Sequence, residues 1–316
     1  MARGNFLAIG ECMIELARDP AGLWRMGFAG DTLNTAWYFR ALAPREQWDV
    51  DFFTRVGTDR YSDRMVAFLQ DAGLGTSRIG RDAARQPGLY LIDVDDGERS
   101  FTYWRGQSAA RLLADDEAAL AAALAAADMV YFSGITLAIL AAERRSLLVE
   151  RIAAARAAGK RTVFDPNIRP RLWEDAGALR EAISAAAGAA AIVLPSADDE
   201  QAAFGDADPQ ATARRYLAAG CDEVVVKSGG GPVTLATPDA ISVVDGLERV
   251  QPVDTTGAGD SFNGAYLARR AAGDGRTEAV RQAHAVASRV VRRPGALIDM
   301  ADLRCQPLRP DRRRRP

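Results

Sequence analysis

The sequence predicts an α/β fold in which a mostly parallel central sheet is covered by helices on both faces. From residue 115 onward, alanine-rich stretches of helical length alternate with short apolar segments. Strands joined by helices of this length form right-handed βαβ units, and the resulting sheet is buried on both faces. Size is the second observation, because 316 residues of which 48% are hydrophobic can bury a large core. The strands predicted in this half are 129–133, 161–164, 191–194 and 223–226.

We expect a single domain over residues 1–303. The sequence contains no internal repeat and no linker long enough to separate two independent domains. Residues 304–316 are rich in arginine and proline, a composition typical of a flexible tail.

The overall charge argues against polyanionic partners. A net charge of −2 and an isoelectric point near 5.7 are unlike those of a nucleic-acid-binding or membrane-surface protein. The three cysteines lie far apart without the histidines that a zinc site would need, which fits a reducing compartment. No leader precedes the first predicted strand and no apolar run is long enough to span a bilayer. We therefore predict a cytoplasmic protein with no membrane or nucleic-acid partner.

The N-terminal part is predicted to alternate strands and helices. Residues 6–10 form a first buried strand, and residues 11–16 an extended piece with partial alternation. Gly30 then gives a bend before a helix that runs to about Leu42. The elements that follow are a strand and turn over 51–59 and a helix over 61–71.

Residues 89–94 and 99–105 predict a β-hairpin, because the Asp-Gly dipeptide between them suits a two-residue turn. Alternation places Phe101, Tyr103 and Arg105 on one face of the second strand. On a face exposed to water, these side chains could form a cation–π ladder that only stabilises the sheet. Over a ligand site, the same face would close a pocket and place the guanidinium on an anionic oxygen. The pattern alone favours neither interpretation.

Two loops that follow predicted strands carry polar side chains. Ligands of open α/β sheets bind beyond the carboxyl ends of the strands, so the run 164–173, with its Asp-Pro-Asn-Ile-Arg segment, is a candidate site. The alternative is a proline-rich loop with solvated arginines. The run 227–231, Lys-Ser-Gly-Gly-Gly, is by itself a flexible turn before a predicted hairpin of 233–236 with 241–244.

The stretch 253–262 carries the strongest chemical signal. Its glycines are predicted to lie at a strand-to-helix corner, where the amides of Gly257, Ala258 and Gly259 form an anion site at the positive end of the helix. Asp260 suits a hydroxyl that attacks a phosphoryl group held by these amides, and the helix end is expected to keep this weak base ionised. The alternative is a plain turn with Asp260 as a helix cap.

This stretch resembles the signature of the ribokinase-like sugar kinases, the PfkB family, in which the aspartate of the Gly-Ala-Gly-Asp segment is the catalytic base. The resemblance extends from about Phe6 to Ala301. It implies a ribokinase-like three-layer α/β/α sandwich with a mostly parallel central sheet and a small β-sheet lid, formed here by about residues 11–29 and 86–107. It also implies ATP as the phosphoryl donor with Mg²⁺ bound to it. We expect a homodimer formed through the lid, because the hairpin has an unpaired edge and aromatic residues.

The same resemblance assigns roles to further residues. The run 28–36 is similar to the sugar-binding Gly-Gly-x-x-x-Asn run of the family, although Ala29 replaces its first glycine. The sugar contacts implied are Gly30, Asp31, Asn34, Tyr90, Tyr103, Arg105, Arg169 and Asp260. The nucleotide contacts implied are Asn167, Ser196, Lys227, Gly229, Gly231, Gly257 and Gly259. A monovalent cation, K⁺, is expected near Asp254 and Thr256, and His284 beside the adenine or in the core.

The expected function is ATP-dependent phosphorylation of an acid sugar, 2-keto-3-deoxygluconate. Within the family, the runs around Asn34, Tyr103 and Arg169 are most similar to those of kinases for this ketoacid sugar. Two alternatives stay open, a kinase for fructose or 2-keto-3-deoxygalactonate and a sugar-binding regulator without turnover. Other chemistries lack their residues, because the sequence has no Gly-x-x-x-x-Gly-Lys-Ser/Thr loop, no dinucleotide fingerprint and no Gly-x-Ser-x-Gly elbow.

Overall fold

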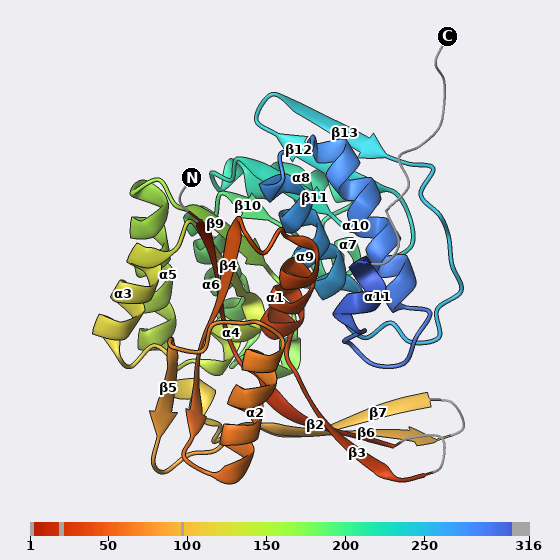
Figure 1. Ribbon diagram of the computed structural model, residues 1–316. Coiled ribbons are helices and arrows are strands. Elements are labelled where there is room, and N and C mark those ends of the chain that lie inside the picture. Colours follow the sequence, from red (N-terminus) through yellow and green to blue (C-terminus); the bar gives the residue numbers. More distant parts are fainter. Residues whose placement is uncertain (1–2, 19–21, 96–97, 305–316) are drawn as a thin grey trace.

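The computed structural model describes residues 3–18, 22–95 and 98–304 (Figure 1). The strands are β1 (Gly4–Ile9), β2 (Met13–Arg18), β3 (Trp24–Ala29), β4 (Trp48–Gly57), β5 (Ile79–Asp82), β6 (Leu89–Asp95), β7 (Glu98–Trp104), β8 (Met129–Ser133), β9 (Arg161–Asp165), β10 (Ile192–Val193), β11 (Glu223–Val226), β12 (Val233–Thr237) and β13 (Ala240–Val244). The helices are α1 (Asp31–Leu42), α2 (Arg60–Asp71), α3 (Glu117–Ala126), α4 (Gly134–Ile139), α5 (Ala142–Ala157), α6 (Ala176–Ala189), α7 (Ala197–Phe204), α8 (Pro209–Ala218), α9 (Ala258–Ala271), α10 (Arg276–Val290) and α11 (Met300–Arg304), with 3₁₀ turns at Ala109–Leu112 and Pro170–Leu172. The predicted Asp96-Gly97 turn and residues 305–316 of the predicted tail lie outside the described residues.

Among the described residues, nine strands form the central sheet in the order β13-β12-β11-β10-β9-β8-β1-β4-β5. Neighbours from β11 to β5 run parallel, whereas β12 and β13 are antiparallel additions at one edge. The predicted mostly parallel sheet is therefore confirmed. The chain leaves β1 toward β4 on one side, and β8 pairs with β1 on the other side, so the strand order reverses at β1. Ligands bind at such a reversal, outside the carboxyl ends of the strands.

Side chains of each central strand alternate between two hydrophobic cores. In β1, Phe6 and Ala8 pack into the core beneath α1, α9 and α10, whereas Leu7 and Ile9 pack into the core beneath α3, α5 and α6. Helices consequently cover both faces of the sheet, as the ribbon view also displays (Figure 1). This arrangement is the three-layer α/β/α sandwich that the sequence predicts.

A second, smaller sheet projects from the body at the bottom of the view in Figure 1. Four strands within the described ranges form it in the order β3-β2-β6-β7. Strands β6 and β7 pair antiparallel from Leu89 opposite Trp104 onward, which confirms the predicted hairpin pairing. Strand β2 joins this hairpin to β3, because it pairs parallel with β6 and antiparallel with β3.

One predicted local feature is wrong. The segment before α9 is not a strand, because residues 245–257 form neither strand nor helix and β13 ends at Val244. Valines and a proline in this segment gave an extended pattern, but an edge hairpin already completes the sheet on that side. No helix of the described residues has both the length and the apolar character needed to cross a bilayer.

Candidate active site

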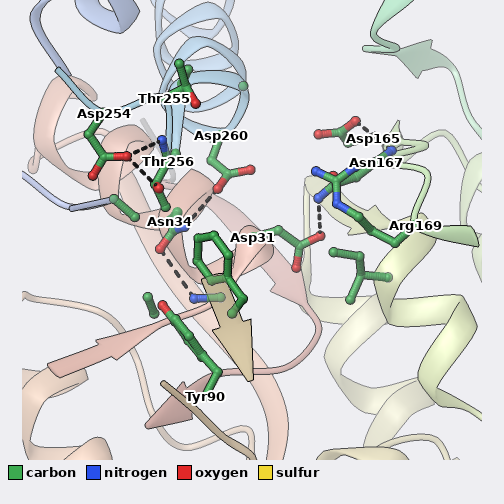
Figure 2. A pocket seen from close by; sticks show the side chains of 18 of the residues that line it. Asp31, Asn34, Tyr90, Asp165, Asn167, Arg169, Asp254, Thr255, Thr256 and Asp260 are labelled. Atoms are coloured by element: carbon green, nitrogen blue, oxygen red, sulfur yellow. Dashed lines mark hydrogen bonds between the residues drawn. The ribbon is translucent and has the colours of Figure 1, made fainter. Parts of the chain in front are cut away.

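A cavity of about 760 Å³ lies at the carboxyl ends of the central strands, between the body and the small sheet (Figure 2). Much of its lining comes from the small sheet, the start of α1, the loop after β9 and the segment 252–260 that leads into α9, and Ser196 and Lys227 add to it after β10 and β11. The predicted site residues that line this cavity are Gly30, Asp31, Asn34, Tyr90, Tyr103, Arg105, Asn167, Arg169, Ser196, Lys227, Asp254, Thr256, Gly257, Ala258, Gly259 and Asp260.

Helix α9 begins at a glycine that no other residue could replace without strain. Gly257 is the N-cap and has a φ of 74°, in the left-handed region. A Cβ there would lie 2.7 Å from the carbonyl oxygen of Ala296. The amide of Ala258 donates to the Thr255 carbonyl at 3.2 Å, so that N–H is already engaged within the turn. Asp260 falls in the first turn of this helix.

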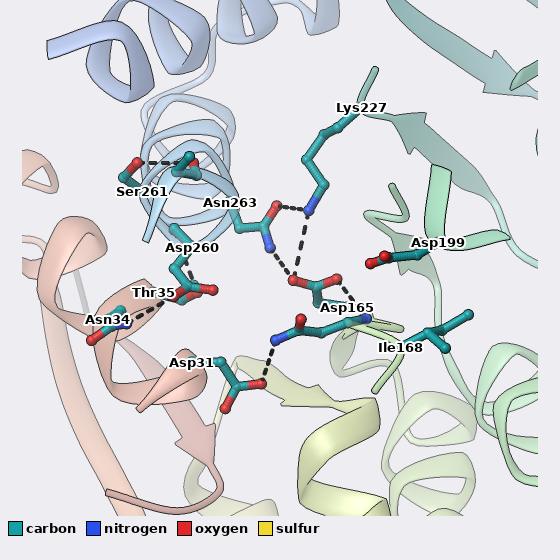
Figure 3. A network of polar contacts seen from close by, with 12 residues as sticks. Asp31, Asn34, Thr35, Asp165, Ile168, Asp199, Lys227, Asp260, Ser261 and Asn263 are labelled. Atoms are coloured by element: carbon teal, nitrogen blue, oxygen red, sulfur yellow. Dashed lines mark hydrogen bonds and ion pairs between the residues drawn. The ribbon is translucent and has the colours of Figure 1, made fainter. Parts of the chain in front are cut away.

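Asp260 is fixed by two residues of α1 (Figure 3). Asn34 Nδ2 donates a hydrogen bond of 2.8 Å to Asp260 Oδ2, and the Thr35 hydroxyl lies 3.4 Å from the Asp260 carbonyl oxygen. The two helices are therefore joined at the point where the carboxyl group faces the cavity. Glycine at position 264, one turn further along α9, permits this approach, because a Cβ there would lie 2.5 Å from the Thr35 carbonyl oxygen.

The pKa of Asp260 is raised to about 8, first by burial and next by the charge of Asp31, whereas the hydrogen bond from Asn34 lowers it. The expectation that the helix end keeps this carboxylate ionised is therefore wrong. A helix start carries only about half an elementary charge. That partial charge does not offset the loss of hydration together with a second buried carboxyl group.

Asp31 shares this buried environment. Its carboxylate accepts a hydrogen bond of 2.9 Å from Asn167 Nδ2, which joins α1 to the loop after β9. Burial raises the pKa of Asp31, and hydrogen bonds from Ser133 and Asn167 partly offset that effect. Asn167 has a φ of 33°, an uncommon backbone conformation for a residue with a side chain. The Asn167 side chain, predicted to contact the nucleotide, therefore hydrogen-bonds to Asp31, a residue predicted to contact the sugar.

A network that the sequence reasoning missed connects β9 to α9 (Figure 3). Asn263 Nδ2 donates to Asp165 Oδ2 at 2.6 Å, and Lys227 Nζ donates to Asn263 Oδ1 at 3.0 Å. Lys227 also lies 3.6 Å from Asp165 Oδ2. Asn263 could have been found from its spacing, because three residues after Asp260 on a helix lies on the same face.

The small sheet contributes stacked aromatic rings to the cavity wall. Phe101 and Tyr103 stack with centroids 6.2 Å apart, and Tyr90 lies 5.7 Å from Tyr103. The Tyr90 hydroxyl hydrogen-bonds to Glu15 on β2. Phe101, Tyr103 and Arg105 therefore do share one face, and that face lines the cavity.

Both predicted arginines reach the cavity, but each already has a carboxylate partner. Arg105 pairs with Glu11, which is buried, and Arg169 lies 3.4 Å from Asp199 with about half of its side chain exposed. Neither guanidinium group therefore depends on a ligand for an anionic partner. Sequence reasoning could not pair residues 94 positions apart, although a glutamate directly after a buried strand was a usable signal.

A second cavity of about 330 Å³ adjoins the first. Ser196, Lys227 and Gly259 line both cavities, and Gly229 lines only the second. The two cavities therefore meet at the start of α9, where Gly259 lies. Gly231 lines neither cavity, since its amide closes a turn onto the Ser228 carbonyl at 2.9 Å.

His284 lines this second cavity from α10, and its Nε2 lies 2.8 Å from the Glu248 carbonyl oxygen. The imidazole therefore faces a mostly apolar hollow rather than the buried carboxyl groups around Asp260.

Asp254 holds together the loops beside α9. Its Oδ1 accepts hydrogen bonds from the amide and hydroxyl of Thr256 at 3.0 and 2.7 Å, and its Oδ2 accepts one from the Gly295 amide at 2.6 Å. Within the described ranges, no group of three or more His, Cys, Asp or Glu side chains is arranged to hold a metal ion.

A three-layer α/β/α body, a small sheet over the cavity, and a glycine-started helix that carries a buried aspartate define a small-molecule kinase with a ribokinase-like fold. The chain belongs to the pfkB family of carbohydrate kinases, whose model matches residues 4–302.

Individual relatives agree with this family. The chain is 39% identical over 306 residues to 2-dehydro-3-deoxygluconokinase from Dickeya dadantii (strain 3937), which covers 95% of this chain and 98% of that relative. It is 38% identical over 296 residues to the enzyme of the same name from Escherichia coli (strain K12). That alignment covers 92% of this chain and 96% of the relative. The crystal structure of a PfkB protein from Polaromonas sp. JS666 matches with a TM-score of 0.81 at 27% identity, which covers 96% of this chain and 100% of that one. The predicted family and fold class are confirmed.

Proposed function

We propose that this carbohydrate kinase transfers the γ-phosphoryl group of ATP to 2-keto-3-deoxygluconate, forming 2-keto-3-deoxy-6-phosphogluconate. One observation carries the proposal: Asp260 lies in the first turn of a glycine-started helix, inside a cavity that two arginines also line. A base, an anion-binding helix start and two guanidinium groups are what phosphorylation of an acid sugar needs. The relatives named 2-dehydro-3-deoxygluconokinase act, by that name, on the same sugar acid.

In this mechanism Asp260 orients the 6-hydroxyl and accepts its proton. As the hydroxyl oxygen bonds to the γ-phosphorus, the bond from that phosphorus to the β–γ bridging oxygen breaks and ADP leaves. Asn34 holds the carboxyl group in place through its 2.8 Å hydrogen bond. Gly257 and Gly259 leave the helix start open to the negative charge that develops on the phosphoryl oxygens.

The second cavity is the proposed position of the nucleotide. It adjoins Asp260 through Lys227 and Gly259, so a nucleotide there would present its last phosphate to the sugar side. Lys227 would supply a positive charge at that boundary, oriented by Asn263 and Asp165. Mg²⁺ bound to the nucleotide would neutralise the β- and γ-phosphates. The described residues contain no group of three or more His, Cys, Asp or Glu side chains that could hold a metal ion, so the phosphates would supply ligands to this Mg²⁺.

The acid sugar is favoured over a neutral one by the charge at the cavity. Arg105 and Arg169 lie on separate segments, and a carboxylate between them would accept charge-assisted hydrogen bonds. Glu11 and Asp199 already offset part of this positive charge, so we expect preference for an acid sugar rather than absolute rejection of neutral sugars.

A monovalent cation beside Asp254 and Thr256 is part of the proposal, and it would be tested by comparing turnover in K⁺ with turnover in choline salts.

We also propose that the small sheet acts as a lid and that two copies pair through it. About half of the Tyr103 and Trp104 side chains is exposed on edge strand β7. A monomer by light scattering at micromolar concentration would contradict the dimer.

Turnover with a panel of sugars tests the function directly. ATP with 2-keto-3-deoxygluconate, 2-keto-3-deoxygalactonate, fructose and ribose would be assayed by ADP release. We expect the highest kcat/KM for 2-keto-3-deoxygluconate. Fructose as the best substrate would support the fructokinase alternative, and sugar binding without turnover would support a regulator.

A further inference from the structure

Four chain segments connect the body to the small sheet, and all of them pass close to Glu11 or to Arg105, which form a buried ion pair. Glu11 lies on the segment from β1 to β2, and Arg105 directly follows β7. The segment from β3 to α1 passes at Gly30, where a Cβ would lie 2.1 Å from the Glu11 carbonyl oxygen. The segment that enters β6 passes at Gly88, where a Cβ would lie 2.9 Å from Glu11 Oε1 and 3.1 Å from Arg105 Cβ.

This ion pair is buried and incompletely satisfied. The Glu11 side chain has no exposed surface, and that of Arg105 is 10% exposed. Glu11 Oε2 accepts a hydrogen bond from one terminal nitrogen of Arg105. Within the described residues, Glu11 Oε1 and Arg105 Nε are buried without a hydrogen-bond partner. A buried pair with unsatisfied atoms stabilises a fold poorly, so its presence here points to a role other than stability.

The two partners face the cavity differently. Arg105 lines it, whereas Glu11 is not among the described residues that do. Glu11 thus lies behind the guanidinium, and because Nε is buried, the remaining terminal N–H groups of Arg105 are the donors that a ligand would meet.

We propose that Glu11 is a positioning residue: it holds the Arg105 guanidinium toward the substrate carboxylate and fixes the small sheet to the body at the four crossings. The proposal rests on the proposed function for the identity of the substrate. Because Glu11 does not touch the reacting hydroxyl, its loss weakens binding of the sugar acid without changing the phosphoryl-transfer step.

Glu11→Gln tests this role, since it preserves size and removes the charge. Loss of a hydrogen bond to a charged group typically weakens an interaction by about tenfold or more, so we expect KM for 2-keto-3-deoxygluconate to rise by about that factor. We expect kcat to stay within about threefold and KM for ATP within about twofold, because those steps do not involve Arg105. Unchanged KM for the sugar acid, or an equal loss in kcat, would overturn the proposal.

A double-mutant cycle separates positioning from a general effect on folding. If Glu11 acts through Arg105, adding Glu11→Gln to Arg105→Ala should change kcat/KM for the sugar acid by less than about twofold. A further tenfold loss in the double variant would contradict it. Glu223→Gln is the matched control, because Glu223 is also buried and ion-paired, with Arg276, but lines neither cavity. It should lower thermal stability and leave KM for the sugar acid unchanged.

Two outcomes keep this inference distinct from the proposed function. If the unmodified chain phosphorylates no acid sugar, the proposed function fails and the positioning role fails with it. If the unmodified chain is active and Glu11→Gln leaves KM unchanged, only the positioning role fails. If Glu11→Gln does not fold, Glu11→Asp is the alternative variant, because it keeps the charge but shortens the side chain by one methylene group and so moves the carboxylate away from Arg105. That variant should fold and still raise KM for the sugar acid, and an unchanged KM would again contradict the proposal.

Discussion

Asn34 on α1 donates a hydrogen bond of 2.8 Å to the Asp260 carboxyl group at the start of α9. These residues are 226 positions apart, and the contact fixes the carboxyl group in the first cavity, next in sequence to Gly259, which lines both cavities. Asn34 also lowers the pKa of Asp260, against burial and the charge of Asp31. The same neighbour therefore holds the proposed base in position and lowers its proton affinity.

Replacing the proposed base should remove turnover but leave nucleotide binding. Asp260→Asn keeps the size of the side chain and can still accept the hydrogen bond from Asn34. We expect kcat to fall by roughly a hundredfold or more, the usual contribution of a general base. The measurement is steady-state turnover together with ATP affinity by calorimetry. Asp239→Asn, at an exposed turn between β12 and β13, is the control, and near-normal kcat for folded Asp260→Asn would exclude Asp260 as the base.

The rate should depend on pH through Asp260. A base with a pKa of about 8 is mostly protonated at pH 7, so kcat/KM should rise with pH and level off above about 8. Asn34→Ala removes a hydrogen bond that lowers this pKa, so the midpoint of its profile should move upward. The measurement is kcat/KM from pH 6 to 10. A flat profile, or a midpoint that moves down in Asn34→Ala, would contradict the assignment.

The same raised pKa makes a prediction about stability. Between the ordinary aspartate pKa of 3.8 and about 8, the folded chain binds a proton at Asp260 that the unfolded chain has lost. This group therefore lowers the free energy of unfolding as pH rises through that window. Asp260→Asn should melt at a higher temperature than the unmodified chain, by a margin that grows from pH 5 to pH 8. Each kcal/mol would raise Tm by about 2 °C, and a margin independent of pH would contradict burial of a titrating group.

The two glycines at the start of α9 should respond differently to substitution. Gly257→Ala puts a side chain at a φ of 74° and 2.7 Å from the Ala296 carbonyl oxygen, so it should lose both stability and activity. At Gly259 a Cβ meets only Lys227 Nζ, at an ordinary 3.7 Å. Gly259→Ala should keep or raise Tm, since alanine favours the helix by up to about 1 kcal/mol. It should nevertheless lose phosphoryl transfer, and full activity would exclude phosphate binding at this loop.

The arginines should control the choice between acid and neutral sugars. Arg105 is buried and Arg169 is half exposed, so Arg105→Ala should lower kcat/KM for the sugar acid more, by roughly a hundredfold against about tenfold for Arg169→Ala. Turnover of a neutral sugar should change far less in both variants. Arg171→Ala is the matched control, because Arg171 is exposed in the same loop and does not line the cavity. Equal losses for acid and neutral sugars would contradict this specificity.

Local patterns in the sequence determined the layered architecture and much of the site. Alternating helical and apolar stretches predict βαβ units, because both periodicities depend only on neighbouring residues. The Asp-Gly hairpin, the glycines before α9 and the loop after β9 were likewise visible, since turn chemistry is local. Sixteen of the predicted site residues, most of them assigned through the family resemblance, line one cavity, while Gly231 turns onto its own loop instead.

Tertiary structure decided what depends on contacts between distant segments. The pairing of Glu11 with Arg105 and the network of Asp165, Asn263 and Lys227 join elements that only the folded sheet brings together. The protonation of Asp260 is the clearest case. Its position at a helix start, read from sequence, favours the ionised form, but burial beside Asp31 raises its pKa to about 8. Desolvation is a property of everything packed around a group, so no local pattern in the chain could have given its size.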